Sequence, residues 1–406
     1  MGKSKIEYCK KAFRAGMFAI CNRVYGRVLP LKEDQVLFAS DVRGEIGGNL
    51  QFVRDHLPKG MQVRYDFLAD RRLPRGVMRS LRLFRDLSTS KYILLEDYFT
   101  YISYMKVRPG QQICQLWHGA GAFKKFGFSR AGNTEGIKVH KGYRKYAKAI
   151  TSADAIRPQY AEAFDIALEK VQATGVPRTD IFFDEDYVAK TRESLYEAYP
   201  VLRDKKVILF APTYRGTSAE DAAYDFSKID PDQLFDALGE DYVFVFKWHP
   251  AAYNNLRREE KAAYELERYG NFFLDLSKER DINDLLLVTD VLITDYSSVI
   301  FDYYLTGKPV IYYAYDLEDY AGGRGMYFPF EEYLFGPVVM NQEGLIEAIR
   351  KADLCEEKRA AFGRKFMEAC DGHATEKTCA WLFEDYIAAH PGSFEAVSQE
   401  DGEAAR

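Results

Sequence analysis

The chain has 406 residues, of which 47% are hydrophobic and 29% charged, and its formal net charge is −5. This length predicts two or three domains that each bury a core. The balanced charge and the lack of any nucleic-acid module spacing argue against a nucleic-acid partner. The six cysteines form no CxxC pair, and no apolar run reaches the ~20 residues of a transmembrane helix. With no secretory signal in the sequence, we expect a cytoplasmic protein.

The first segment, residues 1–31, combines positive charge with a stripe of apolar side chains. It holds seven Lys or Arg residues against a single Glu. At 100° per residue a helix would place six apolar residues on one narrow face with basic flanks, and these are Ile6, Phe13, Met17, Ile20, Val24 and Val28. The pattern predicts an amphipathic helix that rests on an anionic membrane surface. Packing of the stripe on the protein's own core is the alternative.

Residues 32–200 alternate short apolar runs with helical periods, which predicts a parallel sheet covered by helices on both faces. The expected strands are Val36–Ala39, Val63–Leu68, Tyr92–Leu95, Ile113–Trp117 and Ala149–Ser152. The expected helices include Met78–Leu87, Pro158–Leu168 and Tyr187–Tyr199, the last of which is closed by Pro200.

The same alternation restarts after residue 200 and predicts a second α/β domain over residues 201–390. The expected strands are Val207–Phe210, Val243–Phe246, Phe272–Leu274, Val291–Thr294 and Val310–Tyr313. The expected helices are Pro231–Leu238, Ile282–Thr289, Ser298–Leu305, Gln342–Ala352, Glu356–Cys370 and Thr375–Ala389. Residues 391–406 form a polar tail.

Polar groups follow directly after two strands, one in each domain, at the edge of an open α/β sheet where ligands bind. In Leu116–Gly121, His118 stands at the strand end, and histidine is the side chain whose pKa lies nearest neutrality, so it can accept a proton from an alcohol. In Pro212–Gly216, Arg215 offers a planar fork suited to phosphate oxygens. A structural histidine and a solvated arginine in a turn are the alternatives.

Two further strand ends in the second domain carry similar chemistry. Lys247 and His249 bring a cation and a second histidine, which could bridge phosphate oxygens or protonate a leaving group. At Thr294–Ser298 a helix opens, with Ser297 as its cap and Ser298 in its first turn, and its free N–H groups would attract an anion. A buried structural histidine and a plain capped helix are the alternatives.

Together these groups suit a substrate with a pyrophosphate and an alcohol acceptor. The sequence contains neither a GxxxxGK[ST] loop nor a GxGxxG fingerprint, which argues against a P-loop NTPase and a dinucleotide dehydrogenase. No carboxylate cluster has metal-ligand spacing, so we expect neither a metal nor a cofactor.

At these residues the chain resembles the CDP-glycerol:poly(glycerophosphate) glycerophosphotransferase family, which builds teichoic acids and related wall polymers. The resemblance is carried, in chain order, by Trp117–Gly119, Gly175–Asp180, Pro212–Arg215, Trp248–Pro250, Thr294–Asp302, Gly307–Val310 and Arg324–Tyr327. It implies a GT-B-like fold, in which two Rossmann-like domains face a cleft. Residues 32–200 would be the acceptor-side domain and residues 201–390 the nucleotide-donor domain.

The resemblance also implies an activity and a place in the cell. Glycerol phosphate, or a related polyol phosphate, would pass from CDP-glycerol or CDP-ribitol to a hydroxyl of an undecaprenyl-diphosphate-linked saccharide acceptor, releasing CMP. Such an enzyme would be a peripheral protein at the cytoplasmic face of the bacterial cell membrane, in agreement with the stripe in residues 1–31.

Site roles follow from the same resemblance, position by position. His118 would be the catalytic base and His249 would assist at the pyrophosphate. The donor site would be lined by Trp117, Gly119, Ala120, Gly121, Arg178, Pro212, Thr213, Lys247, Ser297, Ser298 and Asp302, with Arg215 and the serine pair offsetting charge on the phosphates.

Several alternatives stay open on the sequence. A GT-B glycosyltransferase that uses a nucleotide sugar is the nearest rival, and a catalytically silent assembly factor is a rival of another class. The retention of both histidines argues against the silent protein. The sequence separates neither glycerol from ribitol nor a primase from a polymerase, and Ala120-Gly121 departs from the Thr-Pro of the polymerases.

Overall fold

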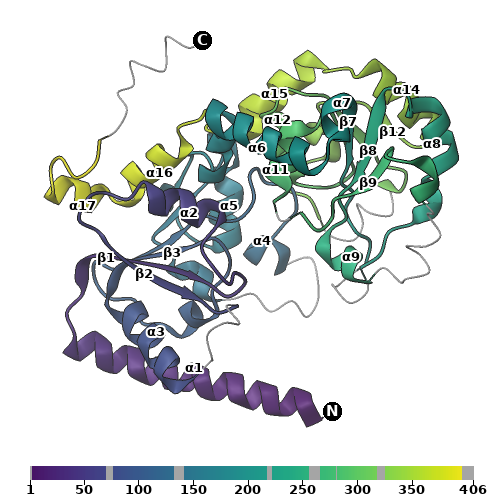
Figure 1. The fold of residues 1–406 in the computed structure, drawn as a ribbon. Helices are drawn as coiled ribbons and strands as arrows, with labels where there is room; N and C mark the ends of the chain where they lie inside the picture. The colour runs from purple at the N-terminus through teal and green to yellow at the C-terminus, as the bar shows by residue number, and fades with distance from the viewer. Residues whose placement is uncertain are drawn as a thin grey trace. The chain divides into compact units, whose positions relative to one another are not determined.

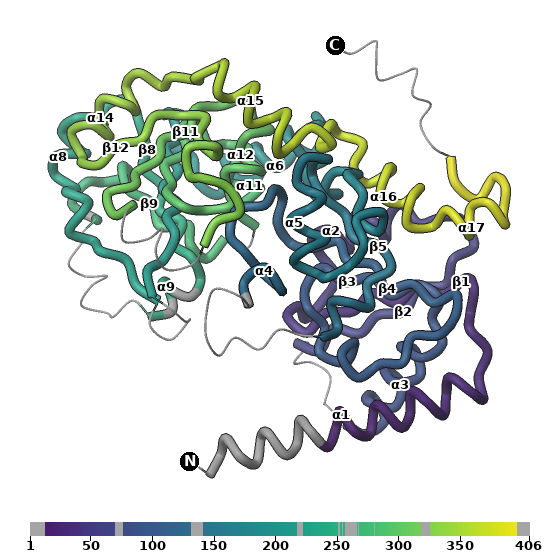
Figure 2. Tube along the Cα trace, turned by 180° about the vertical axis from the view of Figure 1, so that it is seen from behind, coloured from purple at the N-terminus to yellow at the C-terminus, as the bar shows by residue number. Residues whose placement is uncertain are grey.

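The computed structural model describes residues 2–69, 76–131, 141–216, 222–255, 266–279, 281–317 and 325–395. The side chains of residues 2–12, together with Arg324 and the tail beyond residue 395, lie outside this description. The chain forms two compact units: unit 1 comprises Met1–Asp180 with Glu368–Arg406, and unit 2 comprises Ile181–Met367. Each unit is built on a parallel sheet (Figures 1 and 2), which confirms the predicted α/β class.

The sheet of unit 1 has the strand order β2-β1-β3-β4-β5-β6, with every pair parallel. The five strands predicted for residues 32–200 are all present. Four of them are largely buried runs of the kind that parallel sheets require, whereas Gln62–Phe67, at the edge of the sheet, has only its last two residues buried. Its strands are β1 Lys32–Ser40, β2 Gln62–Phe67, β3 Ser90–Leu95, β4 Gln112–Gln115, β5 Lys148–Ile150 and β6 Val171–Gln172. The helices and the 3-10 segments used below are α1 Gly2–Val28, α2 Gly48–Asp55, α3 Val77–Thr89, η1 Thr100–Tyr104, α4 Gly127–Ala131, α5 Arg157–Phe164, η5 Pro177–Phe182, α16 Ala374–Leu382 and α17 Glu384–Ala389.

Helix α1 lies against α3 and η1 along one face (Figures 1 and 2). Phe18 is fully buried there, with its ring 5.0 Å from that of Phe84, and Asn22 donates a hydrogen bond to the hydroxyl of Ser88. The described side chains of the predicted stripe lie roughly 150° around the helix from this buried face. Four of them are exposed to solvent, by 71% at Phe13, 65% at Ile20, 49% at Val24 and 66% at Val28, and Met17 is partly buried. The stripe therefore does not pack on the protein's own core, and its contact with a membrane stays a prediction.

The sheet of unit 2 has the order β9-β8-β7-β10-β11-β12, again with every pair parallel. Counted from β7 this is 3-2-1-4-5-6, the order of the doubly wound dinucleotide-binding fold, whose ligand site lies where the first and fourth strands meet. The strands are β7 Lys206–Phe210, β8 Tyr242–Phe246, β9 Phe273–Asp275, β10 Val291–Thr294, β11 Val310–Tyr313 and β12 Val338–Val339. The helices are α6 Glu185–Ala198, α7 Val201–Asp204, α8 Pro231–Leu238, α9 Pro250–Asn255, α11 Ile282–Val288, α12 Val299–Tyr304, α14 Gln342–Lys351 and α15 Glu356–Phe366.

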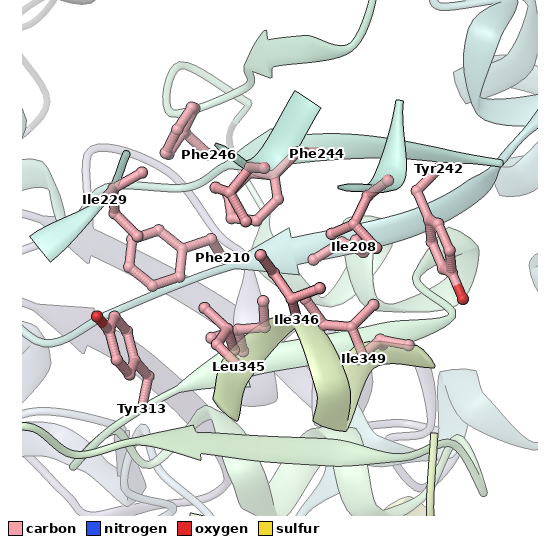
Figure 3. Close-up of a cluster of buried hydrophobic side chains, with 14 of the residues drawn as sticks. Ile208, Phe210, Ile229, Tyr242, Phe244, Phe246, Tyr313, Leu345, Ile346 and Ile349 are labelled. Atoms are coloured by element: carbon pink, nitrogen blue, oxygen red, sulfur yellow. The ribbon is translucent and has the colours of Figure 1, made fainter. Parts of the chain in front are cut away.

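A large aromatic and aliphatic cluster fills one face of the unit 2 sheet (Figure 3). The helix α14 turns Leu345, Ile346 and Ile349 toward side chains of β7 and β8, such as Phe210 and Phe244. Leu345 and Ile349 are completely buried, and each such side chain contributes about 1.5–3 kcal/mol on burial. This packing fixes the strands whose carboxyl ends carry the candidate site.

The unit boundaries differ from the predicted domain boundaries of 200 and 390. Helix α6 packs against α11 and so belongs to unit 2. The last two helices belong to unit 1, because Leu382 and Phe383 are completely buried in its core and the ring of Phe383 lies 5.0 Å from that of Tyr92. One continuous helix was expected over Thr375–Ala389, whereas the chain breaks it at Phe383 into α16 and α17.

Candidate functional site

In unit 1 the candidate site is centred on His118, three residues past the end of β4. Its Nδ1 lies 2.8 Å from Oδ1 of Asp97 and 3.3 Å from the main-chain oxygen of Glu96. The side chain of His118 is 53% exposed, whereas that of Asp97 is 20% exposed. Within the part of the chain that the structure describes, Nε2 of His118 makes no hydrogen bond. One imidazole nitrogen is therefore held by the protein and the other is open to a ligand.

The residue before it, Trp117, adopts a left-handed backbone conformation with φ of +54°, which is uncommon for a bulky residue and costs free energy. Its main-chain N–H donates to Oε1 of Gln115 at 2.9 Å, and its carbonyl accepts from the Asn49 amide at 2.7 Å. The indole ring stacks on the His118 ring with 4.5 Å between centroids. Because both the N–H and the carbonyl of Trp117 are hydrogen-bonded, its left-handed conformation is held in place and sets the position of His118 at the edge of the sheet.

Asn49 also connects this loop to the segment that contains Arg178. Its side-chain oxygen accepts from the main-chain N–H of Arg178 at 3.0 Å, and the Arg178 guanidinium donates to the carbonyl of His118. Asn49 is almost fully buried, so these two hydrogen bonds replace the ones that its side chain would make with water in the unfolded chain. The structure therefore brings together Trp117, His118 and Arg178.

The glycine turn after His118 is held from the side. The N–H of Gly121, whose φ is +67°, donates to Ser152 Oγ at 2.8 Å, and its carbonyl accepts from the Tyr160 hydroxyl at 2.8 Å. Ala120 is buried, whereas Gly119 is partly exposed. Of the predicted residues in this turn, Gly119 is the one that a ligand can approach through its backbone.

Three residues of this site were missed from the sequence: Asp97, Asn49 and Glu96. Glu96 is almost fully buried at the end of β3 and forms an ion pair with Arg43. Polar residues directly after a strand are the same signal that identified His118. The pair Glu96-Asp97 directly follows the predicted strand Tyr92–Leu95, so the rule could have found it.

In unit 2 the candidate site lies where β7 and β10 end side by side, the switch point of the sheet. The main-chain N–H of Thr213 donates to Oδ1 of Asp295 at 2.8 Å, so the two loops are joined. Thr213 is 7% exposed, and its hydroxyl oxygen is buried with no hydrogen-bond partner among the described residues. Pro212 is buried beside it. A buried hydroxyl without a partner at a sheet's switch point is a candidate contact for a polar ligand group.

Arg215 is predicted to hold phosphate oxygens, and in the structure its guanidinium is bound by two carboxylates. Its guanidinium donates to both carboxylate oxygens of Asp316, at 2.5 and 2.8 Å, and to Asp295 at 2.9 Å. Burial lowers the pKa of Arg215, but the two carboxylates more than offset this and the net pKa is raised. The two parallel N–H donors of the guanidinium thus bind Asp316 in this structure. Arg215 also donates to the carbonyl of Thr213 and so stabilises the loop that contains it.

Lys247 also turns inward rather than toward an open edge. Its ammonium donates to the main-chain carbonyls of Ser277, at 3.3 Å, and Glu279. Burial lowers its pKa. Lys247 therefore holds the loop after β9, and its contact with the donor stays a prediction. His249, two residues on, is exposed and lies with its ring 4.7 Å from that of Tyr214.

The serine pair follows β10 as expected, but the helix begins one residue later than predicted. Ser298 occupies the N-cap position of α12 and makes no side-chain capping bond, while Ser297 Oγ accepts from the N–H of Val299 at 3.4 Å. Ser298 is exposed and Ser297 partly so, whereas Asp302 is only 5% exposed. Both serines are within reach of a ligand at the switch point, and Asp302 belongs to the interior.

Two doubly wound units, each with polar side chains at the carboxyl ends of its strands, define the class: an α/β protein built to bind ligands at sheet edges. The sequence profile described as CDP-Glycerol:Poly(glycerophosphate) glycerophosphotransferase matches residues 22–384. The chain belongs to this family, which confirms the resemblance read from its motifs.

Named relatives are similar over most of the chain. The teichoic acid poly(ribitol-phosphate) polymerase of Bacillus spizizenii is 40% identical over 93% of this chain and 60% of its own length. The ribitol-phosphate polymerase TarK of Staphylococcus aureus is 38% identical over 88% of this chain and 70% of its own. The ribitol-phosphate primase of B. spizizenii is 32% identical over 90% of this chain and 95% of its own length. The chain thus spans less than two thirds of the first relative's length and nearly all of the primase.

Among solved structures, the fold is similar to that of the wall teichoic acid polymerase TagF in its H548A variant. The TM-score is 0.73, with 23% identity, over 95% of this chain and 99% of the TagF chain. Among the described residues, no helix is both long and apolar enough to cross a bilayer.

Proposed function

We propose that this protein transfers a polyol phosphate from a CDP-linked donor to a hydroxyl of a lipid-linked acceptor in the synthesis of teichoic acid or a related wall or capsule polymer. The observation that carries the proposal is the geometry of His118. Its Nδ1 faces Asp97 at 2.8 Å, and its Nε2 is left open in a half-exposed side chain. A histidine held in this way can accept the proton of an attacking alcohol, and family membership supports the donor class.

The proposed reaction is a direct displacement at phosphorus. The acceptor oxygen forms a bond to the β-phosphorus of the donor, the acceptor proton passes to Nε2 of His118, and the bond from that phosphorus to the CMP oxygen breaks. CMP leaves with the electron pair, and the polyol phosphate remains on the acceptor. Fixed hydrogen-bond donors around the phosphates would lower the barrier by positioning and by offsetting charge.

The donor is proposed to bind at the switch point of unit 2. The unpaired hydroxyl of Thr213, the accessible serines Ser297 and Ser298, and the exposed His249 are the groups available to its phosphates. Ribitol phosphate is the favoured polyol, because the four relatives that match 87–93% of this chain, at 32–40% identity, are named for it. Glycerol phosphate is the alternative, since the family and other relatives carry that name.

A GT-B arrangement, in which the two Rossmann-like domains face a cleft, is part of the same proposal. The likeness of the fold to TagF over 95% of the chain supports it. In this arrangement His118 would act from unit 1 on a donor held by unit 2, while the undecaprenyl-diphosphate-linked saccharide would approach from the side of unit 1.

We also propose that the exposed face of α1 rests on an anionic membrane at the cytoplasmic side, which makes the protein peripheral. Phe13, Ile20, Val24 and Val28 form an apolar row on the face turned away from the protein. The exposed Arg14, Arg23 and Arg27 on the same helix supply charge complementary to anionic lipids.

The test is CMP release by the purified protein, with CDP-ribitol and CDP-glycerol offered separately beside a short-chain prenyl-diphosphate saccharide acceptor. Acceptor-dependent release from one donor is expected, and product length would separate a primase from a polymerase. His118→Ala should lower kcat by about 10²–10⁴-fold, whereas His56→Ala, an exposed histidine that bonds its own helix at Phe52, should leave kcat unchanged. Turnover of UDP-sugars with silence toward both CDP-polyols would favour a glycosyltransferase and overturn the proposal.

A further inference from the structure

We propose that Asp97 is a positioning residue for His118: its carboxylate keeps the proton of the imidazole on Nδ1 and so leaves the Nε2 lone pair for the acceptor hydroxyl. The inference deepens the proposed function and rests on it, because His118 is the base only in that reaction. Asp97 lies outside the motifs that carry the family resemblance, and its role follows from its contacts.

The topology of the sheet brings the two residues together. Strands β3 and β4 are parallel neighbours in which Leu95 pairs with Gln115, and the N–H of Leu116 donates to the carbonyl of Leu95 at 2.7 Å. Asp97 and His118 follow these paired residues by two and three positions. Both side chains therefore leave the sheet at the same edge, and they meet at 2.8 Å.

The contacts of the imidazole define its tautomer. The two groups near Nδ1, the Asp97 carboxylate and the Glu96 carbonyl, accept hydrogen bonds and donate none when the carboxylate is ionised. The proton must then be on Nδ1, and Nε2 carries the lone pair. When Nε2 accepts the acceptor's proton, the same carboxylate stabilises the imidazolium that forms.

Gln115 holds both halves of this pair in register. It is completely buried, and its amide nitrogen donates to the carbonyl of Asp97 at 3.2 Å and to the Tyr146 hydroxyl at 2.9 Å. Its amide oxygen accepts from the N–H of Trp117 at 2.9 Å. One side chain thus fixes the backbone of Asp97 and of the residue before His118, which limits the error in the carboxylate–imidazole geometry.

A purely structural ion pair would have a different signature. Because the His118 side chain is half exposed, pairing at such a site contributes little to stability. The effect of removing the carboxylate on folding should therefore be small. Its effect on turnover should be large, since a base with its proton on the wrong nitrogen cannot accept another there.

The experiment compares Asp97→Asn with wild type and with Asp165→Asn, which removes an exposed carboxylate paired with Arg144 at 2.5 Å in the same unit. Asp97→Asn should lower kcat for CDP-polyol turnover by about 10²–10⁴-fold, with KM for the donor within about threefold and the urea midpoint little changed. Asp165→Asn should match wild type in kcat.

A second readout needs no turnover. In protein labelled with ¹⁵N-histidine, the signal that disappears in His118→Gln belongs to His118, and its two nitrogens should report an Nδ1–H tautomer that is lost in Asp97→Asn. An Nε2–H tautomer in the wild type, or a kcat of Asp97→Asn within threefold of wild type, would overturn the inference. A wild type that releases no CMP from any CDP-polyol would count against the proposed function instead, and the tautomer would still decide the pairing.

Discussion

At the scale of a single residue, replacing the buried hydroxyl of Thr213 should change ligand binding without lowering stability. It has no partner among the described residues, so the protein loses no hydrogen bond when Val replaces it. Thr213→Val should therefore unfold at the same temperature as wild type or higher. If the hydroxyl bonds a donor phosphate, the loss of about 1 kcal/mol or more should raise KM for the CDP-polyol at least fivefold, as measured by CMP release.

Thr294→Val is the matched control for this change. Thr294 is equally buried, but its hydroxyl donates to the carbonyl of Ala211 at 2.7 Å. The same substitution should here lower stability by about 1 kcal/mol and leave KM close to wild type. A Thr213→Val enzyme with an unchanged KM would remove this hydroxyl from the donor site.

A second residue-scale prediction concerns Asp66, which is 7% exposed at the end of β2. Burial raises its pKa from 3.8 to about 6, although the nearby Arg79 and Arg82 oppose the rise. A raised acid pKa favours folding below pH 4, and this contribution is lost as the pH rises through 6. The unfolding free energy of wild type should thus fall by about 2 kcal/mol relative to Asp66→Asn between pH 4 and 7, as followed by urea denaturation.

If the difference in unfolding free energy between wild type and Asp66→Asn stayed constant across this pH range, the carboxyl of Asp66 would not be the titrating group. The matched substitution Asp165→Asn removes an exposed carboxylate, and it should show no such pH-dependent difference from wild type. The comparison thereby distinguishes burial from the mere loss of one charge.

The sequence predicted which residues stand at strand ends but not what each one touches. His118, Thr213 and Ser297 are where the strand-end rule placed them. Arg215 and Lys247 satisfy the same rule, yet they bond to Asp316 and to main-chain carbonyls. Partners so far apart in sequence meet only through the tertiary fold, so no local pattern reports them.

At the scale of the element, the two faces of α1 differ in burial, which leads to a prediction about membrane binding. The face that contains Phe18 is buried against α3, whereas Ile20 and Val24 are exposed. Changing both exposed residues to Asp should leave the melting temperature nearly unchanged. It should weaken binding to phosphatidylglycerol vesicles at least tenfold, since each apolar side chain in a bilayer interface contributes about 1.5–3 kcal/mol. Vesicle co-sedimentation measures this.

The control for α1 is Leu168→Asp, which places one negative charge on an exposed leucine elsewhere in unit 1 and should not change vesicle binding. Equal binding by the double variant and wild type would show that this face of α1 does not meet the lipid.

Elements with a strong period were predictable and the shortest ones were not. Pro231–Leu238 was predicted to the residue, because a proline and an aspartate cap define its start. Strands β6 and β12 were missed, since two residues carry no period. Glu356–Cys370 was predicted too long, as the helix ends at Phe366 just before the chain passes into unit 1.

At the scale of the whole molecule, the sequence indicated two α/β domains. It assigned the final helices to the second domain, whereas in the structure they belong to unit 1. Their apolar side chains fit either core by pattern alone, and only the contacts decide between them. Chain order favoured the adjacent domain. The return of the chain at Glu368 to complete the core of unit 1 is a long-range pairing, which a periodicity argument along the sequence does not detect.

The division at Met367 and Glu368 predicts opposite effects for two buried phenylalanines in this last stretch. Phe383 lies in the core of unit 1, and Phe366 lies in unit 2 with its ring 5.2 Å from that of Tyr333. Either change to Ala should cost about 3–5 kcal/mol. In single-tryptophan proteins that retain Trp381 for unit 1 or Trp248 for unit 2, Phe383→Ala should shift the urea transition of the Trp381 signal more. Phe366→Ala should shift that of Trp248 more, and the reverse pattern would refute this assignment of the final helices.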